Sequence, residues 1–556
     1  MRGSLDTRFE ALAEARFEDV VRRNPVLATF LGRHEHDGLL GDLRPEAVEE
    51  EMAETRAYIA HLEELDPAEL SADVRFEREL ALWTARKDRF AIEEIRAWER
   101  RPAAIDELGD GLFALFARDF APLSERLDAI TARLEEAPRV LTEQRRRLTG
   151  RPVRRWHAIE LGQVRQLPGF LGEIEATAAQ AWQGDDARVE RLRRAATSAG
   201  VALEGYGAWL TAGMGDADDD FPLGSKRYDE LVALRAFEGL GSDEILEIGE
   251  QQLAEQRAAR VAVAREIDPR ASEAEVLDRV KTDHAATFAD ALEEYRQAML
   301  DARRHIVEHD LMTIPTGERL EVIPTPEYLR QVMPFAAYFE PPRFDRQPTG
   351  VYIVTPSVAD EPGAMREHNR ASISNTSIHE AYPGHHLQLS AAITHPSLVR
   401  VLVDAPEFTE GWAMYCEQMM REEGFDAAPR FRLMMHTDAI WRACRIVLDI
   451  RLHRGQISVP EAIEYLVSNT GFERANATAE VERYTSTPTY QLSYLLGKVM
   501  LLRLRADERR RLGPAFSLKA FHDALIYAGS LPVSFHRRLL AGEGGGAATP
   551  RPLPGH

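Results

Sequence analysis

The spacing of apolar residues predicts helices over most of the chain. Apolar positions recur every three or four residues among abundant Ala, Leu, Glu and Arg, which favour helices. Pro25, Gly32 and the stretch 38–42 predict a loop between the first two helical segments. The predicted helices cover residues 5–23, 44–65, 70–98, 122–148, 155–183, 186–212 and 242–267.

The pattern changes at about residue 310, where prolines recur and short β-like runs appear. Leu320–Ile323 and Gly350–Val354 are rich in branched or aromatic residues, which is typical of strands. Helical periodicity resumes at about residue 373 and continues to about residue 540. We therefore predict a mainly α fold, a large multi-helix scaffold with one small β-sheet.

These changes divide the chain into three predicted regions. Residues 1–310 form an N-terminal helical region, which we interpret as a lid or scaffold. Residues 311–545 form the candidate catalytic region. Residues 546–556 belong to a Gly- and Pro-rich end, which predicts a flexible tail.

Composition and charge restrict the function classes. The 556 residues are 44% hydrophobic and carry a formal net charge of −22. Nucleic acids and anionic membranes both require a basic face, so we expect neither as a partner. The sequence shows no run of 18 apolar residues and no signal-peptide pattern at its start. Its two cysteines, Cys416 and Cys444, cannot build a disulfide framework, and we expect a cytoplasmic protein.

The segment HEAYPGHH, from His379 to His386, carries the residue types of a metal hydrolase. In the common H-E-x-x-H motif, two histidines four residues apart share one helix face and one zinc ion. Here the second histidine comes six or seven residues after the first. On an ideal helix an i+6 pair points about 120° apart, and an i+7 pair lies about 10 Å apart along the axis. Zinc-bound nitrogens lie within about 4 Å of each other, so an unbroken helix brings neither pair onto one ion.

The Pro383-Gly384 step offers a solution. Proline lacks an N–H and glycine accepts unusual dihedral angles, so the helix can break there and restart at His385. The segment TEGWAMYCE predicts a second helix with acids at Glu410 and Glu417. Glu410 is our candidate third ligand, and Glu417 lies two turns further along the same face. The alternative is a histidine-rich turn that ends at Pro383 and only packs.

The motifs HEAYPGHHLQ and TEGWAMYCE resemble the bacterial domain-of-unknown-function family number 885. That family is similar to the gluzincins, above all to thimet-oligopeptidase-like peptidases, which use H-E-x-G-H on a helical scaffold. The resemblance favours His385 over His386 and implies a small sheet beside the metal-binding helix. It implies one Zn²⁺ ion held by His379, His385 and Glu410. Further matches lie at 24–32 with Asp37, 350–354, 368–372, 442–453, 480–484 and 521–523.

The catalytic roles follow from the chemistry of such sites. Glu380 would take a proton from water and deliver it to the leaving amine. A tyrosine, either Tyr494 or Tyr484, would stabilise the oxyanion. The segment 488–494 departs from the Pro-Gly-Gln-Ala-like run expected before the tyrosine, so both tyrosines remain candidates.

Other residues suggest substrate contacts. The strand Gly350–Val354, with Tyr352 at its centre, could pair with an extended substrate by edge addition. Arg442 and Arg445 share a helix face and could bind a carboxylate bidentately, or could form ion pairs with an acid such as Asp449. His386 could contact substrate, donate to a ligand, or simply pack.

The most favoured function is a zinc-dependent hydrolase, a peptidase that acts on short peptides or other amide bonds. Cyclic amides and esters suit the same chemistry. Two histidines and one carboxylate also suit a non-haem iron oxygenase, although an oxygenase needs no adjacent glutamate base. A metal-stabilised binding protein without turnover is the third class. The sequence does not predict an oligomeric state.

Overall fold

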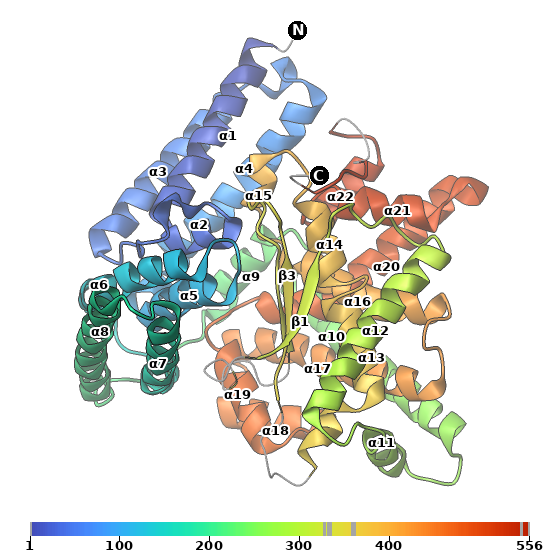
Figure 1. The fold of residues 1–556 in the computed structure, drawn as a ribbon. Coiled ribbons are helices and arrows are strands. Elements are labelled where there is room, and N and C mark those ends of the chain that lie inside the picture. The colour runs from blue at the N-terminus through green and yellow to red at the C-terminus, as the bar shows by residue number, and fades with distance from the viewer. Residues whose placement is uncertain (1–2, 326–329, 331–335, 357–362, 545–548, 554–556) are drawn as a thin grey trace. The chain divides into compact units, whose positions relative to one another are not determined.

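The computed structural model describes residues 3–325, 330, 336–356, 363–544 and 549–553. Most of these residues are helical, and they include one three-stranded sheet (Figure 1). The prediction of a mainly helical fold with a small sheet is therefore confirmed. The chain divides into two compact units, residues 1–221 with 342–347, and residues 222–341 with 348–554.

Helices of the first unit follow the apolar periodicity closely. In helix α8, for example, Leu192, Ala196, Ala199 and Leu203 are buried at three- and four-residue spacing, which gives one apolar face. The α-helices of this unit are α1 (Ser4–Arg23), α2 (Pro25–Leu31), α3 (Pro45–Glu63), α4 (Ala72–Phe90), α5 (Ala104–Ala117), α6 (Leu123–Arg147), α7 (Arg154–Ala181) and α8 (Asp186–Gly213).

The motif at residues 24–37 has a structural role in this unit. The buried Arg133 donates to the hydroxyl of Thr29 at 2.7 Å, and that hydroxyl donates to Asp37 Oδ1 at 2.7 Å. Asp37 Oδ2 lies 2.9 Å from Nδ1 of His34, whose Nε2 lies 2.8 Å from Asp345 Oδ1. The motif thus ties α2 and α6 to the segment 342–347.

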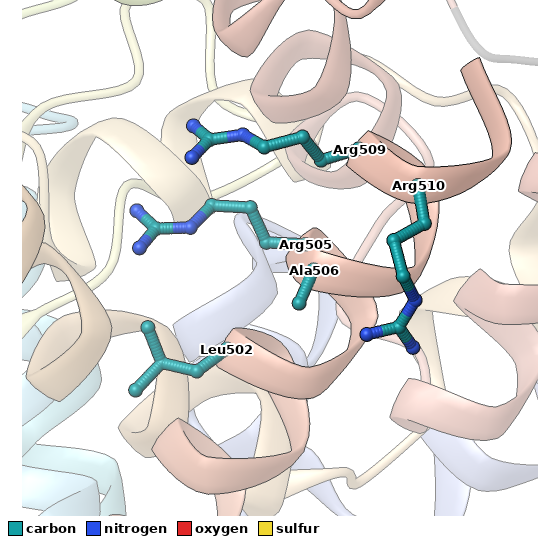
Figure 2. Close-up of a pocket in the computed structure, with 5 residues that line it drawn as sticks. All are labelled: Leu502, Arg505, Ala506, Arg509 and Arg510. Atoms are coloured by element: carbon teal, nitrogen blue, oxygen red, sulfur yellow. The ribbon is translucent and has the colours of Figure 1, made fainter. Parts of the chain in front are cut away.

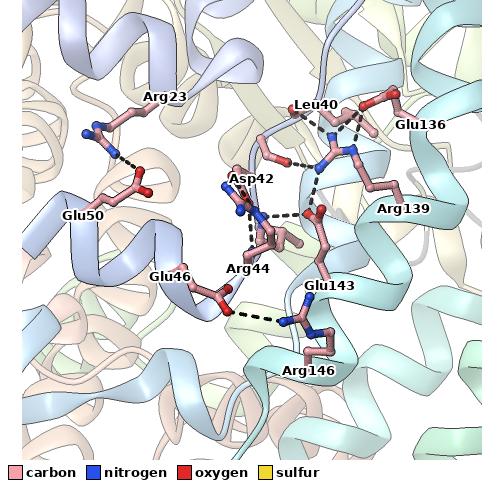
Figure 3. A network of polar contacts seen from close by, with 12 residues as sticks. Arg23, Leu40, Asp42, Arg44, Glu46, Glu50, Glu136, Arg139, Glu143 and Arg146 are labelled. Atoms are coloured by element: carbon pink, nitrogen blue, oxygen red, sulfur yellow. Dashed lines mark hydrogen bonds and ion pairs between the residues drawn. The ribbon is translucent and has the colours of Figure 1, made fainter.

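A second polar network fixes the loop before α3 (Figure 3). Arg139 donates to Glu143 at 2.7 Å and to the backbone oxygen of Leu40 at 3.3 Å. Arg146 pairs with Glu46 at 3.3 Å. The exposed Arg146–Glu46 pair contributes only about 0–1 kcal/mol, whereas the Arg139–Glu143 pair is part-buried and holds the loop.

The second unit contains the sheet and the residues predicted to carry the chemistry. Among the described residues, no helix combines the length and apolar character that a membrane span requires. The helices of this unit are α9 (Gly224–Leu234), α10 (Ser242–Ile267), α11 (Glu273–Lys281), α12 (Phe288–Glu308), α13 (Arg370–Glu380), α14 (His385–Ala392), α15 (Leu398–Val401), α16 (Pro406–Glu422), α17 (Pro429–His453), α18 (Val459–Thr470), α19 (Arg474–Tyr484), α20 (Ser493–Leu512), α21 (Leu518–Ile526) and α22 (Val533–Leu540).

The sheet has the order β1-β3-β2. Strands β1 (Leu320–Pro324) and β3 (Gly350–Val354) are the two predicted strands, and they pair in parallel. Strand β2 (Ala336–Phe339) was not predicted and pairs antiparallel with β3. In the register of the sheet, Tyr352 lies between Val322 and Tyr338.

The prediction that β3 pairs with an extended substrate is wrong. Strand β3 is central, so β1 and β2 already satisfy both of its hydrogen-bonding edges. The side chain of Tyr352 is also fully buried, with 0% exposure. Tyr352 therefore belongs to the core of this unit.

Helices α16 and α20 are in backbone contact where two glycines meet. A Cβ atom added to Gly497 would lie 2.0 Å from the carbonyl oxygen of Glu407 and 2.8 Å from Cα of Gly411. Any larger residue would therefore push the two helices apart. The close approach fixes α16, which carries both predicted acids, against the core of the unit.

The three regions predicted from the sequence, 1–310, 311–545 and 546–556, remain predictions. The boundary near residue 310 falls between α12 and β1, and nothing within either unit bears on a lid. In the predicted tail, residues 546–548 and 554–556 lie outside the described residues. Leu553 is described, is buried, and donates its N–H to Thr316 O at 3.1 Å.

Candidate metal centre

The helix is interrupted between His379 and His385, as predicted. Helix α13 ends at Glu380, and α14 begins at His385. The N–H of Gly384 donates to the carbonyl oxygen of Ile378 at 2.9 Å, so the chain folds back onto the last turn of α13. A Cβ atom at Gly384 would lie 1.9 Å from the carbonyl oxygen of His379, so only glycine fits at this position.

This break brings the two predicted histidine ligands together. The ring centroids of His379 and His385 lie 4.8 Å apart, with the rings nearly perpendicular at 88°. A continuous helix would separate them, so the Pro383-Gly384 step performs the function expected of it. Their side chains are largely buried, with 8% and 11% exposure.

Glu410, on α16, completes a cluster of three candidate ligands. Its Oε2 atom lies 3.5 Å from Nε2 of His379 and 3.3 Å from Nε2 of His385. One ligand atom from each residue lies within 4.8 Å of the others, and this is the metal-type cluster found among the described residues. The three predicted ligands are thus brought to one point.

The donor set fits a metal ion. Oε2 of Glu410 is buried and has no hydrogen-bond partner among the described residues. Burial raises the pKa of Glu410, but its contacts with His385 and His379 outweigh this effect and hold the pKa well below its usual value. The result is an ionised oxygen directed at two imidazole nitrogens, which suits a divalent cation such as zinc.

Glu417 supports the first histidine. Its Oε1 atom lies 2.7 Å from Nδ1 of His379, on the opposite side of the ring from Glu410. The amide of Asn375 donates to Glu417 at 3.0 Å and to Asp438 at 2.8 Å. A carboxylate on the second ring nitrogen fixes the tautomer of a metal-binding histidine. The position of Glu417 on the same face as Glu410 was predicted from the sequence, but its contact with His379 was not.

Tyr490 supports the carboxylate ligand and was missed by the sequence analysis. Its hydroxyl donates to Glu410 Oε1 at 2.9 Å, which leaves Oε2 facing the histidines. The hydroxyl of Tyr494 donates to that of Tyr490 at 3.5 Å. The two tyrosines are four residues apart across the start of α20, and this spacing was the only available signal.

Glu380, the predicted base, lies at the end of α13 next to His379. It is half-buried, and its carboxylate makes no hydrogen bond or ion pair with the described residues. Neighbouring acids differ from it in this respect, because Glu417 is held by His379 and Asn375. Glu380 is therefore the carboxylate beside the cluster whose oxygens remain available to water.

His386 points away from the cluster and into a separate polar network. Its Nε2 lies 2.9 Å from Glu318, and its Nδ1 lies 2.9 Å from the hydroxyl of Tyr338. Glu318 is also held by Arg303 at 3.0 Å. His386 is fully buried, so this network occupies both of its ring nitrogens and leaves His385 as the ligand-type histidine.

Tyr484 and Arg445 are engaged with each other. Arg445 Nε donates to the hydroxyl of Tyr484 at 3.1 Å, and that hydroxyl donates to Glu480 at 2.7 Å. Arg445 also pairs with Glu480 at 2.8 Å. Asp449, the acid that was considered as an ion-pair partner of Arg442 and Arg445, instead accepts a hydrogen bond from Tyr228 at 2.6 Å.

A pocket of about 310 Å³ on α20 lies apart from this cluster (Figure 2). Arg505, which lines it, donates to Tyr415 at 3.2 Å and to Glu422 at 2.8 Å. Arg509 lies over the ring of Phe516, 5.1 Å from its centroid. These side chains have structural partners, and none of the candidate ligands lines the pocket.

Comparison with known proteins gives the family. The profile described as "Bacterial protein of unknown function (DUF885)" matches residues 25–540. The chain belongs to this family. The family resemblance of HEAYPGHHLQ and TEGWAMYCE is thereby confirmed, and the candidate ligands all lie within the part of the chain that the DUF885 profile covers.

Two solved structures share this fold over nearly their whole length. A "putative lipoprotein of unknown function" from Shewanella oneidensis is 23% identical with a TM-score of 0.79, covering 96% of this chain and 99% of that chain. A "putative lipoprotein" from Colwellia psychrerythraea is 18% identical with a TM-score of 0.84, covering 96% and 98%. No curated protein sequence matches this DUF885 chain.

Proposed function

We propose that this protein is a metal-dependent hydrolase of amide bonds, with short peptides as its most favoured substrates. The convergence of His379, His385 and Glu410 carries the proposal, because three ligands from one cluster leave further positions of an ion open to water and substrate. The free carboxylate of Glu380 beside them favours hydrolysis over electron-transfer or oxygen chemistry.

We propose Zn²⁺ as the ion. Two imidazole nitrogens and one carboxylate are a ligand set that zinc hydrolases use. A bound zinc ion would polarise the scissile carbonyl and make a water molecule acidic near neutral pH. The likeness to gluzincins that the motif suggests agrees with this ion, and it remains part of the proposal.

The protein's own residues would perform the remaining steps. Glu380 accepts a proton from the attacking water and delivers it to the leaving amine. Glu417 keeps the proton of His379 on Nδ1, and Tyr490 fixes the orientation of Glu410. Tyr494 is the better candidate for stabilising the oxyanion, because the hydroxyl of Tyr484 is already bound to Glu480 and Arg445.

The experiment that tests this function is digestion of a peptide library, read by mass spectrometry, with zinc-loaded protein. Cleavage should stop when a chelator is added and return when zinc is restored. Glu380→Gln should retain the metal and lose about 10²–10⁴-fold in rate. Dioxygen-dependent oxidation of a substrate would instead assign the iron oxygenase class, and metal binding without turnover of any peptide would assign a binding protein.

We propose a cytoplasmic location from the acidic composition and the two buried free cysteines, Cys416 and Cys444. The two structures that share the fold are described as lipoproteins, which makes the cell envelope the competing location. Fractionation of cells that express the native gene decides between them. A small substrate is the only partner we propose.

A further inference from the structure

A second charged cluster lies beside the metal centre, on α17 and α20. Arg442 and Arg445 both lie against the indole of Trp441, 3.8 and 4.1 Å from its centroid. Both also face the ring of Tyr494, at 5.9 and 4.6 Å. The two guanidinium groups and two aromatic rings form one unit, which we call the arginine cluster.

The arginine cluster adjoins the candidate ligands along two routes. On one side, Tyr494 lies 3.5 Å from Tyr490, which donates to Glu410. On the other side, Arg442 lies 3.9 Å from Asp438, and Asn375 links Asp438 to Glu417. Tyr494 therefore links the arginines to Tyr490, the tyrosine that donates to Glu410.

The positive charge of this cluster is only partly balanced. Glu480 pairs with Arg445 at 2.8 Å and with Arg483 at 3.1 Å, so one carboxylate serves two arginines. Arg442 makes no hydrogen bond with the described residues. Its ion pair with Asp438 is long, at 3.9 Å, and Asp438 accepts a hydrogen bond from Asn375.

Buried donors in the cluster lack acceptors. Nη1 of Arg445 and Nε of Arg442 are both buried and have no hydrogen-bond partner among the described residues. A buried guanidinium N–H without an acceptor is costly, so these two groups can each take an acceptor from a water molecule or a ligand. Arg442 keeps 14% side-chain exposure, against 4% for Arg445, so an incoming group would meet Arg442 first.

We propose that the arginine cluster binds a free carboxylate of the substrate, on the leaving-group side of the bond that is cleaved. The planar fork of Arg442 matches a carboxylate in two parallel hydrogen bonds, and Arg445 adds a second fixed charge over the same indole ring. The inference rests on the proposed function. It narrows the substrate class to peptides cut at their C-terminal residue, or acyl-amino acids, because there the carboxylate lies one residue from the scissile carbonyl.

The test compares N-acetylated peptides that end in a free carboxylate with the same peptides that end in a carboxamide. Zinc-loaded wild type should cleave the free acid with a kcat/KM on the order of 10²-fold higher. In Arg442→Gln the preference should disappear through a raised KM for the free acid. Arg442→Lys, which keeps the charge without the fork, should recover only part of it. Arg451→Gln, which removes an arginine of α17 that pairs with Glu250, is the matched control and should behave as wild type.

A second experiment, which measures binding without turnover, tests this inference independently of the proposed function. The same peptides are titrated by calorimetry into zinc-loaded Glu380→Gln protein, with zinc content measured for every variant. Tighter binding of the free acid, lost in Arg442→Gln at unchanged zinc content, supports the arginine cluster even if wild type turns over neither peptide. Cleavage of acid and amide at equal rates, or equal or absent binding of the free acid, overturns the inference. The first of these results would leave the hydrolase assignment intact.

Discussion

Oε1 of Glu417 lies 2.7 Å from Nδ1 of His379, while Glu410 lies on the other ring nitrogen of the same histidine. Two carboxylates from one face of α16 thus hold one imidazole from both sides. Glu417 sets the tautomer of His379, and Glu410 lies at the point to which both His379 and His385 are directed. These two roles require two acids on one face of α16, and the acids are seven residues apart.

Replacing Glu417 should weaken metal binding without removing a ligand. Glu417→Gln should lower zinc affinity about 10–100-fold, because His379 loses the carboxylate that orients it. Competition with a chromogenic chelator measures this. Glu422→Gln, at an acid of the same helix that pairs with Arg505, is the control and should not change the affinity. Equal affinities in the two variants would contradict the role of Glu417.

Substitutions of Tyr490 and Tyr494 should affect different quantities, zinc affinity for Tyr490 and kcat for Tyr494. Tyr490→Phe removes the hydrogen bond to Glu410 and should reduce zinc affinity. Tyr494→Phe should leave zinc affinity unchanged and lower kcat on any cleaved peptide, because its hydroxyl contacts no ligand directly. The pair of measurements, zinc affinity and kcat for each variant, would refute the assignment if Tyr494→Phe lost metal and Tyr490→Phe did not.

Asp449 should make the fold pH-dependent. Burial raises its pKa to about 7, against about 4 in an unfolded chain, and its Oδ1 has no hydrogen-bond partner among the described residues. The native state therefore keeps a proton on Asp449 that the unfolded chain releases above about pH 4. This contribution to stability is complete below pH 4, falls as the pH rises, and is lost above about pH 7.

Thermal unfolding of wild type and Asp449→Asn from pH 4 to 8 checks this dependence. The Tm of wild type relative to the variant should fall between about pH 4 and 7 and then level off. Asparagine can still accept from Tyr228 and from the N–H of Thr489, so the variant should fold. Parallel Tm curves over this range would show that Asp449 is ionised in the native protein.

The α16–α20 crossing should tolerate no added methyl group. Gly497→Ala places a Cβ atom 2.0 Å from a backbone oxygen of α16 and should cost about 1–3 kcal/mol or more, because two helix backbones must move. Gly200→Ala in α8, where a Cβ atom meets nothing within 4 Å, should be neutral or slightly stabilising. Chemical denaturation of both variants measures the difference, and a neutral Gly497→Ala would show that the helices can separate freely.

Features that depend on neighbouring residues alone, such as helix ends and the helix break, could be predicted from the sequence. Helix α10 begins and ends at the predicted residues 242 and 267, and the Pro383-Gly384 break lies where those two residue types require it. Strand β2 was missed because Ala336–Phe339 has no alternating pattern and exists through its pairing with β3. For the same reason, β3 was wrongly expected to have a free edge.

The supporting residues of the site could not be predicted because they depend on tertiary contacts. Tyr490 reaches Glu410 across 80 residues of chain, and Glu318 reaches His386 across 68. Nothing in the spacing of either pair indicates the contact. The convergence of the three candidate ligands could be predicted because the family motif holds His379 and His385 within seven residues and Glu410 on the next long helix.

The most direct test of the account is the zinc content of purified protein after loading and desalting, measured by mass spectrometry of the elements. Wild type should bind one zinc ion per chain. His385→Ala should lose it, whereas His386→Ala should keep it, because both ring nitrogens of His386 are bound to Glu318 and Tyr338. Loss of zinc in His386→Ala with retention in His385→Ala, or no zinc bound to wild type, would contradict the metal centre at His379, His385 and Glu410.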